Sequence, residues 1–587
     1  MAVAIEAGRA AAEATPGRFA RRWGGTLWTG ALLVVLTFLV AYPVAMLLLG
    51  ALTKTNPIVD GFGKFDLSIA NFAAVMASPG VQAATLNTLV ICSLGTLVAL
   101  VIGVGFAWIV ARTNTPCKRL IESAGIMPLF VPPLVGAVAW SILGSPKTGL
   151  FNTFLKQMGF DFRIDLYSMT GVVLVFGMYY APYVYMFVVS TLKNMDPSLE
   201  EAAEVSGAGP LRTMLTITFP LIAPAILSSM LLTFIVMLGI YGIPAVLGTP
   251  AKISVLTTYI FALTSWSPPL FNTAAAVAIL LIAVTAVCVW LQQRVLSRRS
   301  YVTVTGKSFK PKQLDLGVWR WLTLSLAVIY LFVVVVLPCA ALLIASFRRY
   351  MFVPNLASLF DTKQYGLIHF ERLLGTDIVW RSIWNTLEVG VLTALIGGAL
   401  AFAIGYTVTR TLLPGRRLLD MLSTAPVAIP GLVIGVAYLW AWIGLPGGLW
   451  GTTLILALAL VARFLPDTVK VLSGSLMQIH KELEEASRIC GRGTLQTVLR
   501  IVLPIARPGV VAAMTLLFIL AIRELGSSLF LFTNDTIVMA VLLLDLYEGG
   551  NAGATAAFSV VQSVILLLVL GASSLLSRTV SGVVARS

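Results

Sequence analysis

Long apolar runs separated by short charged segments dominate this sequence. Runs of about twenty residues are the length that a helix needs to cross a bilayer, whereas barrel strands would alternate polar and apolar residues at every second position. We therefore predict an all-α integral membrane protein with about twelve spanning helices. They lie near residues 27–52, 86–110, 121–144, 170–191, 221–247, 272–292, 321–346, 385–409, 420–443, 451–475, 505–532 and 552–577.

Basic residues gather in the short segments between particular pairs of runs. A linker at 293–320 carries seven lysines and arginines against one acid, Asp315. Cytoplasmic loops of membrane proteins are enriched in such residues, so this pattern places the linker and both chain ends in the cytoplasm. The predicted organisation is an N-terminal tail (1–26), a first six-helix half (27–292), the basic linker, a second six-helix half (321–577) and a C-terminal tail (578–587).

The two halves are an internal repeat. Asn87, Arg112, Pro116, Pro128 and Pro132 match Asn385, Arg410, Pro414, Pro426 and Pro430 at one constant spacing, and Pro182, Gly207, Pro220 and Pro224 match Pro466, Gly491, Pro504 and Pro508 at another. A deletion in the outer loop after the third span explains the change of spacing. Because each half has an even number of spans, the halves have the same orientation and a pseudo-two-fold axis along the membrane normal. Prolines within spans are expected to kink or break the helices.

A charged segment recurs in both halves, as EAAEVSGAGPLRTMLTITFP (201–220) and EASRICGRGTLQTVLRIVLP (485–504). Asp196 and Pro197 predict a capped helix start, and Gly207 predicts a C-cap with positive φ. A second short helix should follow and end at Pro220. The second copy begins with His480 instead of Asp-Pro, so it should be less well capped. We interpret each copy as a helix–turn–helix on the cytoplasmic face that binds a soluble partner.

Composition narrows the function classes. The chain has 587 residues, of which 58% are hydrophobic and only 11% charged, with a mean hydropathy of +0.94. Soluble proteins have about 25% charged residues. The net charge of +15 reflects clusters beside apolar runs, which argues for helix orientation and against nucleic-acid binding. No cysteine pair has metal-ligand spacing, and the two histidines, His369 and His480, lie in predicted loops, so no metal site is expected.

The repeated segment resembles the EAA loop of the permeases of bacterial binding-protein-dependent ABC importers. Asn87-Thr88-Leu89, Arg112, Pro116 and Pro128 resemble the flanking pattern of the same family. The resemblance implies a fused permease of the type I fold in the inner membrane, in which each loop docks onto one of two ATPase subunits. A periplasmic binding protein would deliver the substrate. The implied coupling residues are Glu200, Glu201, Ala202, Ala203, Gly207, Glu484, Glu485, Ala486 and Gly491.

The same resemblance implies a transport subunit and not an enzyme. ATP and Mg²⁺ would bind the partner ATPase, and no cofactor is expected in this chain. Gly306-Lys307-Ser308 matches only the end of a phosphate-binding loop, because the leading glycine of that motif is replaced by Tyr301. Unequal capping of the two copies predicts that the two ATPase contacts differ in strength, with unequal loss of transport when Glu201 or Glu485 is disrupted.

The transported substrate is less clearly marked. Fused permeases with a stretch such as 241–250 (YGIPAVLGTP) most resemble ferric-iron importers, while relatives for thiamine, phosphonates or polyamines share the architecture. Ionisable residues inside spans are costly and point to a pathway. Arg523 and Glu524 are not duplicated in the first half, and with Tyr241 they are the pathway candidates. Arg463 and Asp467, four residues apart, could pair on one helix face.

Two other classes of protein fit the sequence less well. An ion-driven secondary transporter made of two parallel repeats needs a titratable site near the midplane, and the first half offers almost none. A membrane scaffold without transport gives no reason for paired coupling loops. The expected function is therefore import by alternating access, with ferric iron as the favoured substrate.

Overall fold

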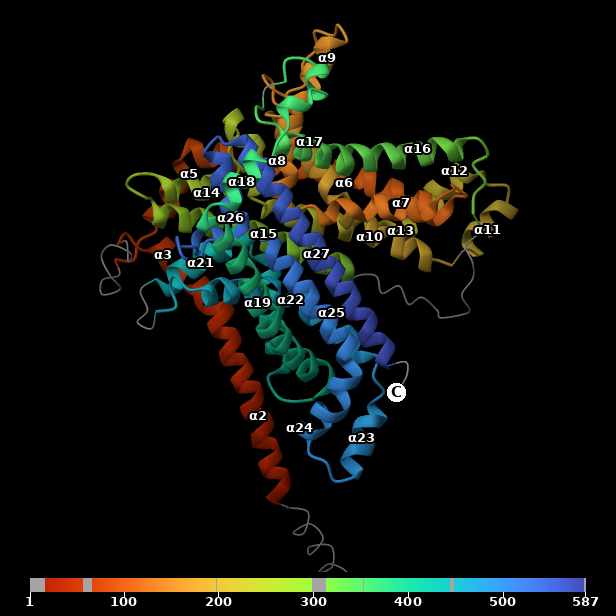
Figure 1. The fold of residues 1–587 in the computed structure, drawn as a ribbon. Coiled ribbons are helices and arrows are strands. Elements are labelled where there is room, and N and C mark those ends of the chain that lie inside the picture. Colours follow the sequence, from red (N-terminus) through yellow and green to blue (C-terminus); the bar gives the residue numbers. More distant parts are fainter. Residues whose placement is uncertain are drawn as a thin grey trace, which may run out of the picture.

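The computed structural model describes residues 16–55, 66–196, 198–297, 313–351, 353–443 and 448–584, and nearly all of them are helical (Figure 1). The first half contains α2 (Pro16–Leu36), α3 (Tyr42–Leu52), α5 (Ala70–Ala77), α6 (Pro79–Arg112), α7 (Lys118–Ile126), α8 (Pro133–Gly144), α9 (Leu150–Gln157), α10 (Met169–Asn194), α11 (Ser198–Val205), α12 (Pro210–Thr213), α13 (Phe219–Leu238), α14 (Leu256–Ser265) and α15 (Phe271–Ser297). The predicted all-α class is confirmed.

The second half repeats this order of elements. It contains α16 (Trp319–Leu331), α17 (Leu337–Phe347), α18 (Ile368–Leu374), α19 (Asp377–Arg410), α20 (Arg416–Thr424), α21 (Gly431–Trp442), α22 (Thr453–Met477), α23 (Lys481–Ile489), α24 (Thr494–Thr497), α25 (Leu503–Arg523), α26 (Met539–Glu548) and α27 (Ala552–Val584). The helices α6 and α19 both have 34 residues. Only α9 lacks a counterpart among the described elements, and it lies after α8, where the sequence predicted the deletion.

Within the described residues, nine helices are long and apolar enough to span a membrane, and the number is up to twelve when each of three bent helix pairs is counted as one span. Two of the bent pairs correct the prediction of continuous third and ninth spans. Lys118–Phe130 meets Pro133–Gly144 at 99°, and Arg416–Ala428 meets Gly431–Trp442 at 112°. Pro132 and Pro430 stand at these breaks, because proline cannot donate the backbone hydrogen bond that a continuing helix requires.

The fifth and eleventh spans begin and end earlier in the sequence than predicted, as Met214–Leu238 and Thr494–Arg523. The helix α13 ends at Leu238, and α25 ends at Arg523. The chain then forms a bent pair, Pro244–Ala251 with Leu256–Ser265, at 77°. In the second half, the chain after α25 passes through a short 3₁₀ turn, Ser528–Phe530, to α26. The sequence did not predict α14 or α26, which lie between the predicted spans and have only ten residues each, too few to cross a bilayer.

Four turns of π-helix occur where a proline would otherwise disturb a spanning helix. They are Thr37–Ala41, Met214–Thr218, Phe332–Val336 and Val498–Val502, and each is followed by a helix with proline in its first turn. A π turn shifts the hydrogen-bond register and so accommodates the missing N–H. The sequence analysis predicted that the short helix ends at Pro220. This is wrong, because Met214–Leu238 is one span that continues through Pro220.

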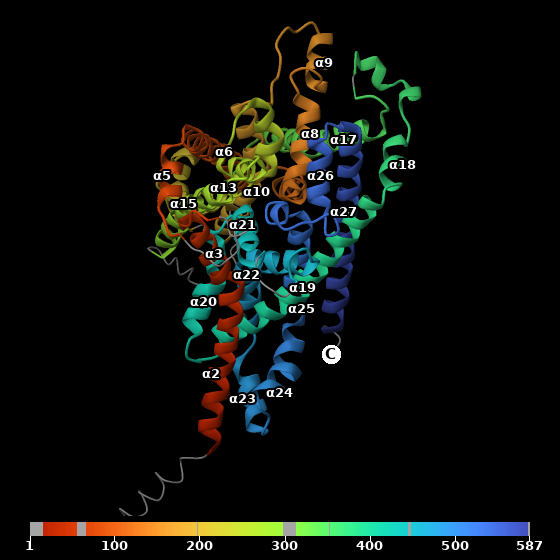
Figure 2. The ribbon, with the colours of Figure 1, turned by 90° about the vertical axis from the view of Figure 1, so that its left-hand side faces the viewer.

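The first helices of the two halves also pack against the opposite half. The α2–α3 segment packs against α20 and α21 of the second half, and α16–α17 packs against α7 and α8 of the first (Figures 1 and 2). The Trp28 indole donates a hydrogen bond to Thr407 Oγ1 at 3.0 Å, and the Tyr330 hydroxyl donates to Met178 O at 2.8 Å. Each half therefore encloses an element of the other, which makes the chain one interlocked unit.

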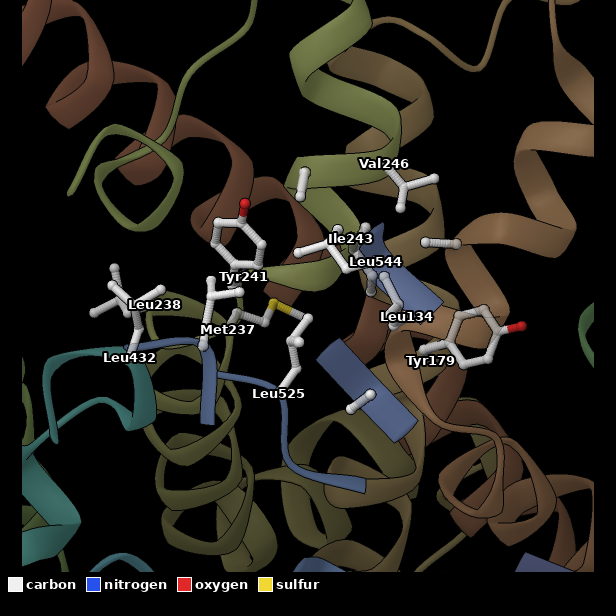
Figure 3. Packing of buried hydrophobic residues seen from close by; sticks show 14 of the residues in the cluster. Leu134, Tyr179, Met237, Leu238, Tyr241, Ile243, Val246, Leu432, Leu525 and Leu544 are labelled. Atoms are coloured by element: carbon white, nitrogen blue, oxygen red, sulfur yellow. The ribbon is translucent and has the colours of Figure 1, made fainter. Parts of the chain in front are cut away.

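The apolar core continues across both halves. In Figure 3, Tyr241, Met237 and Leu238 of the first half lie with Leu432 and Leu525 of the second. The long helices of the two halves run in clearly different directions, so α11 and α23 lie at the far ends of two helix sets (Figure 1). This places the two charged segments away from the shared core.

Candidate functional site

The first charged segment folds as predicted into two helices joined by a glycine turn. Asp196 Oδ1 accepts a hydrogen bond from Ser198 N at 2.9 Å, next to Pro197, which lies outside the described residues. Gly207 has φ +80° after the end of α11, which confirms the expected left-handed turn. Its N–H donates to Glu204 O at 2.9 Å, and Ala208 N donates to Ala203 O at 2.9 Å. These two bonds satisfy carbonyls that the end of the helix leaves free.

Glu200 connects this segment to the membrane helices. Its carboxylate lies 3.2 Å from Arg112 Nε at the end of α6, and it accepts a hydrogen bond from Thr218 Oγ1 at 2.7 Å. The side chains of Arg112 and Glu200 are 5% and 19% exposed. A carboxylate and guanidinium so far from water hold a fixed relative position, because separating them would leave an uncompensated charge.

The second segment has the same connection with more bonds. Glu484 Oε1 accepts from Arg410 Nε at 2.8 Å and lies 2.7 Å from Nη2, while its Oε2 accepts from the Tyr406 hydroxyl at 2.9 Å. Arg410 also donates to Ile479 O at 2.9 Å. The Glu484 side chain is only 7% exposed. Gly491 has φ +79°, as expected from its match to Gly207. Both segments are thus braced on the long helices α6 and α19 at equivalent positions.

The remaining predicted coupling residues lie on the outer side of the two segments. Glu201, Ala202 and Gly207 are exposed and Ala203 is half-buried, while Glu485, Ala486 and Gly491 are exposed. An exposed apolar side chain lies at the equivalent position of each segment: Val205 is 90% exposed and Ile489 is 86% exposed. The predicted set therefore divides into two buried glutamates, which brace the segments, and an outward face that a partner could contact.

A cavity of about 370 Å³ lies beside the first segment. Glu200, Glu201 and Glu204 line one side, and the end of the linker between the halves closes the other with Gln313, Leu314 and Asp315. Leu314 N donates to Arg112 O at 2.8 Å, and Asn114 N donates to Leu314 O at 3.1 Å. The linker is thus tied to the first half next to its coupling segment.

The pathway candidates lie in two different environments. Tyr241 is 4% exposed and packs edge-on against Phe261 with 5.3 Å between ring centroids, inside the apolar core (Figure 3). Arg523 is the last residue of α25 and Glu524 follows it, and both are half-buried. Arg523 Nη2 donates to Val131 O of the first half at 3.4 Å. The structure brings Arg523 and Glu524 together at the interface between halves, and it places Tyr241 in packing.

Arg463 does not pair with Asp467, contrary to the sequence interpretation. Its Nη1 donates instead to Ile429 O at 2.6 Å, and no ion pair joins the two side chains in the described part of the chain. Val131 and Ile429 occupy equivalent positions before the two proline breaks. The two arginines therefore supply hydrogen bonds to matching carbonyls that a broken helix leaves without partners.

Sequence reasoning missed two tyrosines in this region. Tyr180 and Tyr183, in the middle of α10, interact electrostatically with Arg463, Arg523 and Glu524, and their rings stack with centroids 5.8 Å apart. A signal was available: Tyr183 and Asp467 directly follow the matching prolines Pro182 and Pro466. Among the described residues no group of three or more histidine, cysteine, aspartate or glutamate side chains could hold a metal ion.

A family model for the inner membrane component of binding-protein-dependent transport systems matches this chain twice, over residues 99–301 and 401–582. The chain belongs to this family. The two matches fall on the two helical repeats, so the protein is a fused permease of an ABC importer and a multi-pass inner membrane protein.

Similar proteins include two permeases of comparable organisation. The chain is 28% identical over 486 residues to the ferric transport system permease protein FbpB of Actinobacillus pleuropneumoniae, covering 82% of this chain and 69% of that protein. It is 28% identical to the putative ferric transport system permease protein FbpB 1 of Haemophilus influenzae, covering 78% and 71%. A solved bacterial alginate ABC transporter in complex with its periplasmic protein matches at 21% identity and a TM-score of 0.40, covering 50% of this chain and 99% of that one.

Proposed function

We propose that this permease imports ferric iron received from a periplasmic binding protein, with energy from two ATPase subunits that dock on the two charged segments. The observation that carries the proposal is the pair of equivalent braces, Arg112 with Glu200 and Arg410 with Glu484. Each brace connects an exposed cytoplasmic segment to one 34-residue helix. ATP and Mg²⁺ would bind the ATPase subunits, and both chain ends would lie in the cytoplasm.

The braces explain how motion of a docked subunit would reach the membrane. A partner that binds the outward face of α11 or α23 would move that segment. The ion pair of Glu200 or Glu484 would then transmit the motion to the end of α6 or α19. Separating Glu484 from Arg410 would leave a buried charge unpaired, which costs about 3–5 kcal/mol. The segment and the long helix therefore move as one body. Closing two such bodies together would turn the halves between outward-facing and inward-facing states.

The substrate assignment rests on two supports. The stretch 241–250 resembles that of ferric-iron importers, and the FbpB proteins are similar over most of this chain. Selective ligands for iron would be supplied by the binding protein, so the permease needs a path more than a tight metal site. Thiamine, phosphonate and polyamine importers are the alternatives within the family.

Copurification from membranes tests the ATPase part of the proposal. The expected result is two copies of an ATPase subunit for each chain, and uptake into proteoliposomes that requires ATP. Uptake that proceeds without ATP and follows a proton gradient would overturn it. That outcome would favour an ion-driven transporter, for which the half-buried Glu524 and the exposed Asp467 in the middle of α22 are the relevant groups.

Binding measurements test the substrate part independently. The periplasmic binding protein that supports uptake by this chain should bind ferric iron, and iron-loaded binding protein should stimulate ATP hydrolysis by the assembled complex. A binding protein with affinity for thiamine or a polyamine and none for ferric iron would remove the iron assignment while leaving the importer intact.

A further inference from the structure

Six polar side chains from α10, α22 and the end of α25 interact where the two halves face each other. They are Tyr180, Tyr183, Arg463, Asp467, Arg523 and Glu524, here called the central polar cluster. Gly431 brings two of them close together, since a Cβ at this glycine would collide with Glu524 Oε1 and lie 3.2 Å from Arg463 Nε. Ionisable groups at this depth are expensive and are retained where they serve a function.

Packing alone does not account for the cluster. The Nη groups of Arg463 and Arg523 bond to the carbonyls at the helix breaks, but Nε of each guanidinium is buried without a hydrogen-bond acceptor. The Tyr180 hydroxyl is also buried without a partner, and the residue is 4% exposed. An unmade bond at a buried donor costs about 1–3 kcal/mol, so three such donors in one place are a considerable penalty for a purely structural feature.

Two of the three unpartnered groups, the guanidinium N–H groups of Arg463 and Arg523, can only donate, whereas the Tyr180 hydroxyl can donate or accept. Acceptor oxygens would satisfy all three groups. Arginine pairs favour carboxylate and phosphate oxygens because their planar donors match such groups. The carboxylates Asp467 and Glu524 oppose a free anion but would accept a metal ion that accompanies it. Asp467 is exposed although it lies inside α22, so the cluster extends to the surface of the described chain.

We propose that the central polar cluster is a binding station for a small multi-oxygen anion on the translocation path. The proposal rests on the proposed import function and adds the chemical class recognised between the halves. The anion either travels alone or is coordinated to the ferric ion. The station is asymmetric, because both arginines come from the second half while both tyrosines come from the first. The equivalents of Arg523 and Glu524 in the first half are Gly239 and Ile240, which carry no charge.

Tyr180→Phe separates binding from folding. The hydroxyl has no partner in the protein, so its removal should leave thermal stability unchanged or slightly raised. A hydroxyl that donates to a bound anion makes a charge-assisted hydrogen bond, so its removal should lower affinity by at least about tenfold. Tyr179→Phe is the matched control. Tyr179 lies next to it in α10, and its hydroxyl donates to Val334 O at 3.5 Å. That change should leave affinity unchanged.

The experiment uses the full chain in nanodiscs and two probes, citrate and ferric citrate, measured by equilibrium binding. Tighter binding of ferric citrate supports an anion that travels with the metal, and equal binding of both supports an anion recognised by itself. Unchanged affinity in Tyr180→Phe, or no binding of either probe by the wild-type chain, would overturn the station. Arg523→Gln should weaken binding at least tenfold, whereas Arg381→Gln, which removes an exposed outer pair with Asp535, should not. Copurification of the ATPase is scored on the same preparations, so failure of the station is distinguishable from failure of the importer proposal.

Discussion

The two charged segments are stabilised in different ways. The first has a side-chain cap at its start, from Asp196, and a brace in which Glu200 is partly exposed. The second has no side-chain cap at His480, but its Glu484 is almost fully buried and bonds to both Arg410 and Tyr406. The segment with the side-chain cap has the more exposed ion pair, and the segment without the cap has the more buried one. A helix terminus judged weak from its sequence can be the one more firmly attached to the rest of the molecule.

Removing the brace should have the largest effect, and it should be larger in the second half. Glu484→Ala leaves the Arg410 charge buried and unpaired, which should lower the free energy of unfolding by about 3–5 kcal/mol. Glu200→Ala should cost less, about 1–3 kcal/mol, because the Glu200 side chain is closer to water than that of Glu484. Thermal unfolding of the purified variants, with Glu482→Ala as an exposed control on the same helix, measures the difference. Equal losses from both braces would contradict the comparison.

Filling the turn glycines should have an intermediate effect that is similar in both halves. Gly207→Val and Gly491→Val place a branched side chain at φ +80° and +79°, where the strain is about 1–3 kcal/mol. Nothing lies within 4 Å of the added Cβ at either glycine, so the effect comes from the backbone alone. We expect loss of ATP-coupled uptake and of ATPase copurification. Gly209→Ala and Gly493→Ala are the controls, since both have open space and ordinary φ. Fully ATP-coupled uptake in both valine variants would refute the docking role.

Removing the cap should have a smaller effect, confined to the first segment. Asp196→Ala should cost about 1 kcal/mol, because the Ser198 N–H loses its acceptor. His480→Ala should cost nothing through capping. Hydrogen exchange of peptides from α11 and α23 measures the local change. If His480→Ala loosened α23 as much as Asp196→Ala loosens α11, the capping difference would have no consequence. Unequal loss of transport on disrupting Glu201 or Glu485 stays a prediction of the same asymmetry.

The smallest effect should come from the tie between linker and first half. Hydrogen bonds from the Gly317 N–H and the Asn114 amide lower the pKa of Asp315. The tie is therefore fully present above the ordinary value of 3.8 and is lost as pH falls through the lowered pKa. Asp315→Ala should speed hydrogen exchange around Asn114 at neutral pH and remove the pH dependence. Peptides from the matching loop 411–415 should not change, and a change there would show that the tie acts on both halves.

Much of the architecture could be predicted because it depends on patterns among residues that are close together in the sequence. The length of apolar runs indicates spanning helices, matched prolines and glycines establish the repeat, and a glycine after a charged helix predicts a left-handed turn. The bent third span of each half could not be predicted with confidence, since a proline kinks or breaks a helix according to what surrounds it. Pro182 and Pro466 lie within continuous helices, whereas Pro132 and Pro430 stand at breaks.

The sequence by itself determined the membrane class, the two parallel repeats and the positions of the coupling segments, because these depend on hydrophobicity and backbone preferences near each residue. Only the tertiary structure decided that Glu200 and Glu484 face inward as braces, that Arg463 bonds to the Ile429 carbonyl, and that Tyr180 meets Arg523. Those outcomes depend on partners many residues away along the chain. A buried charge or donor takes whichever partner the packing of two halves brings within reach.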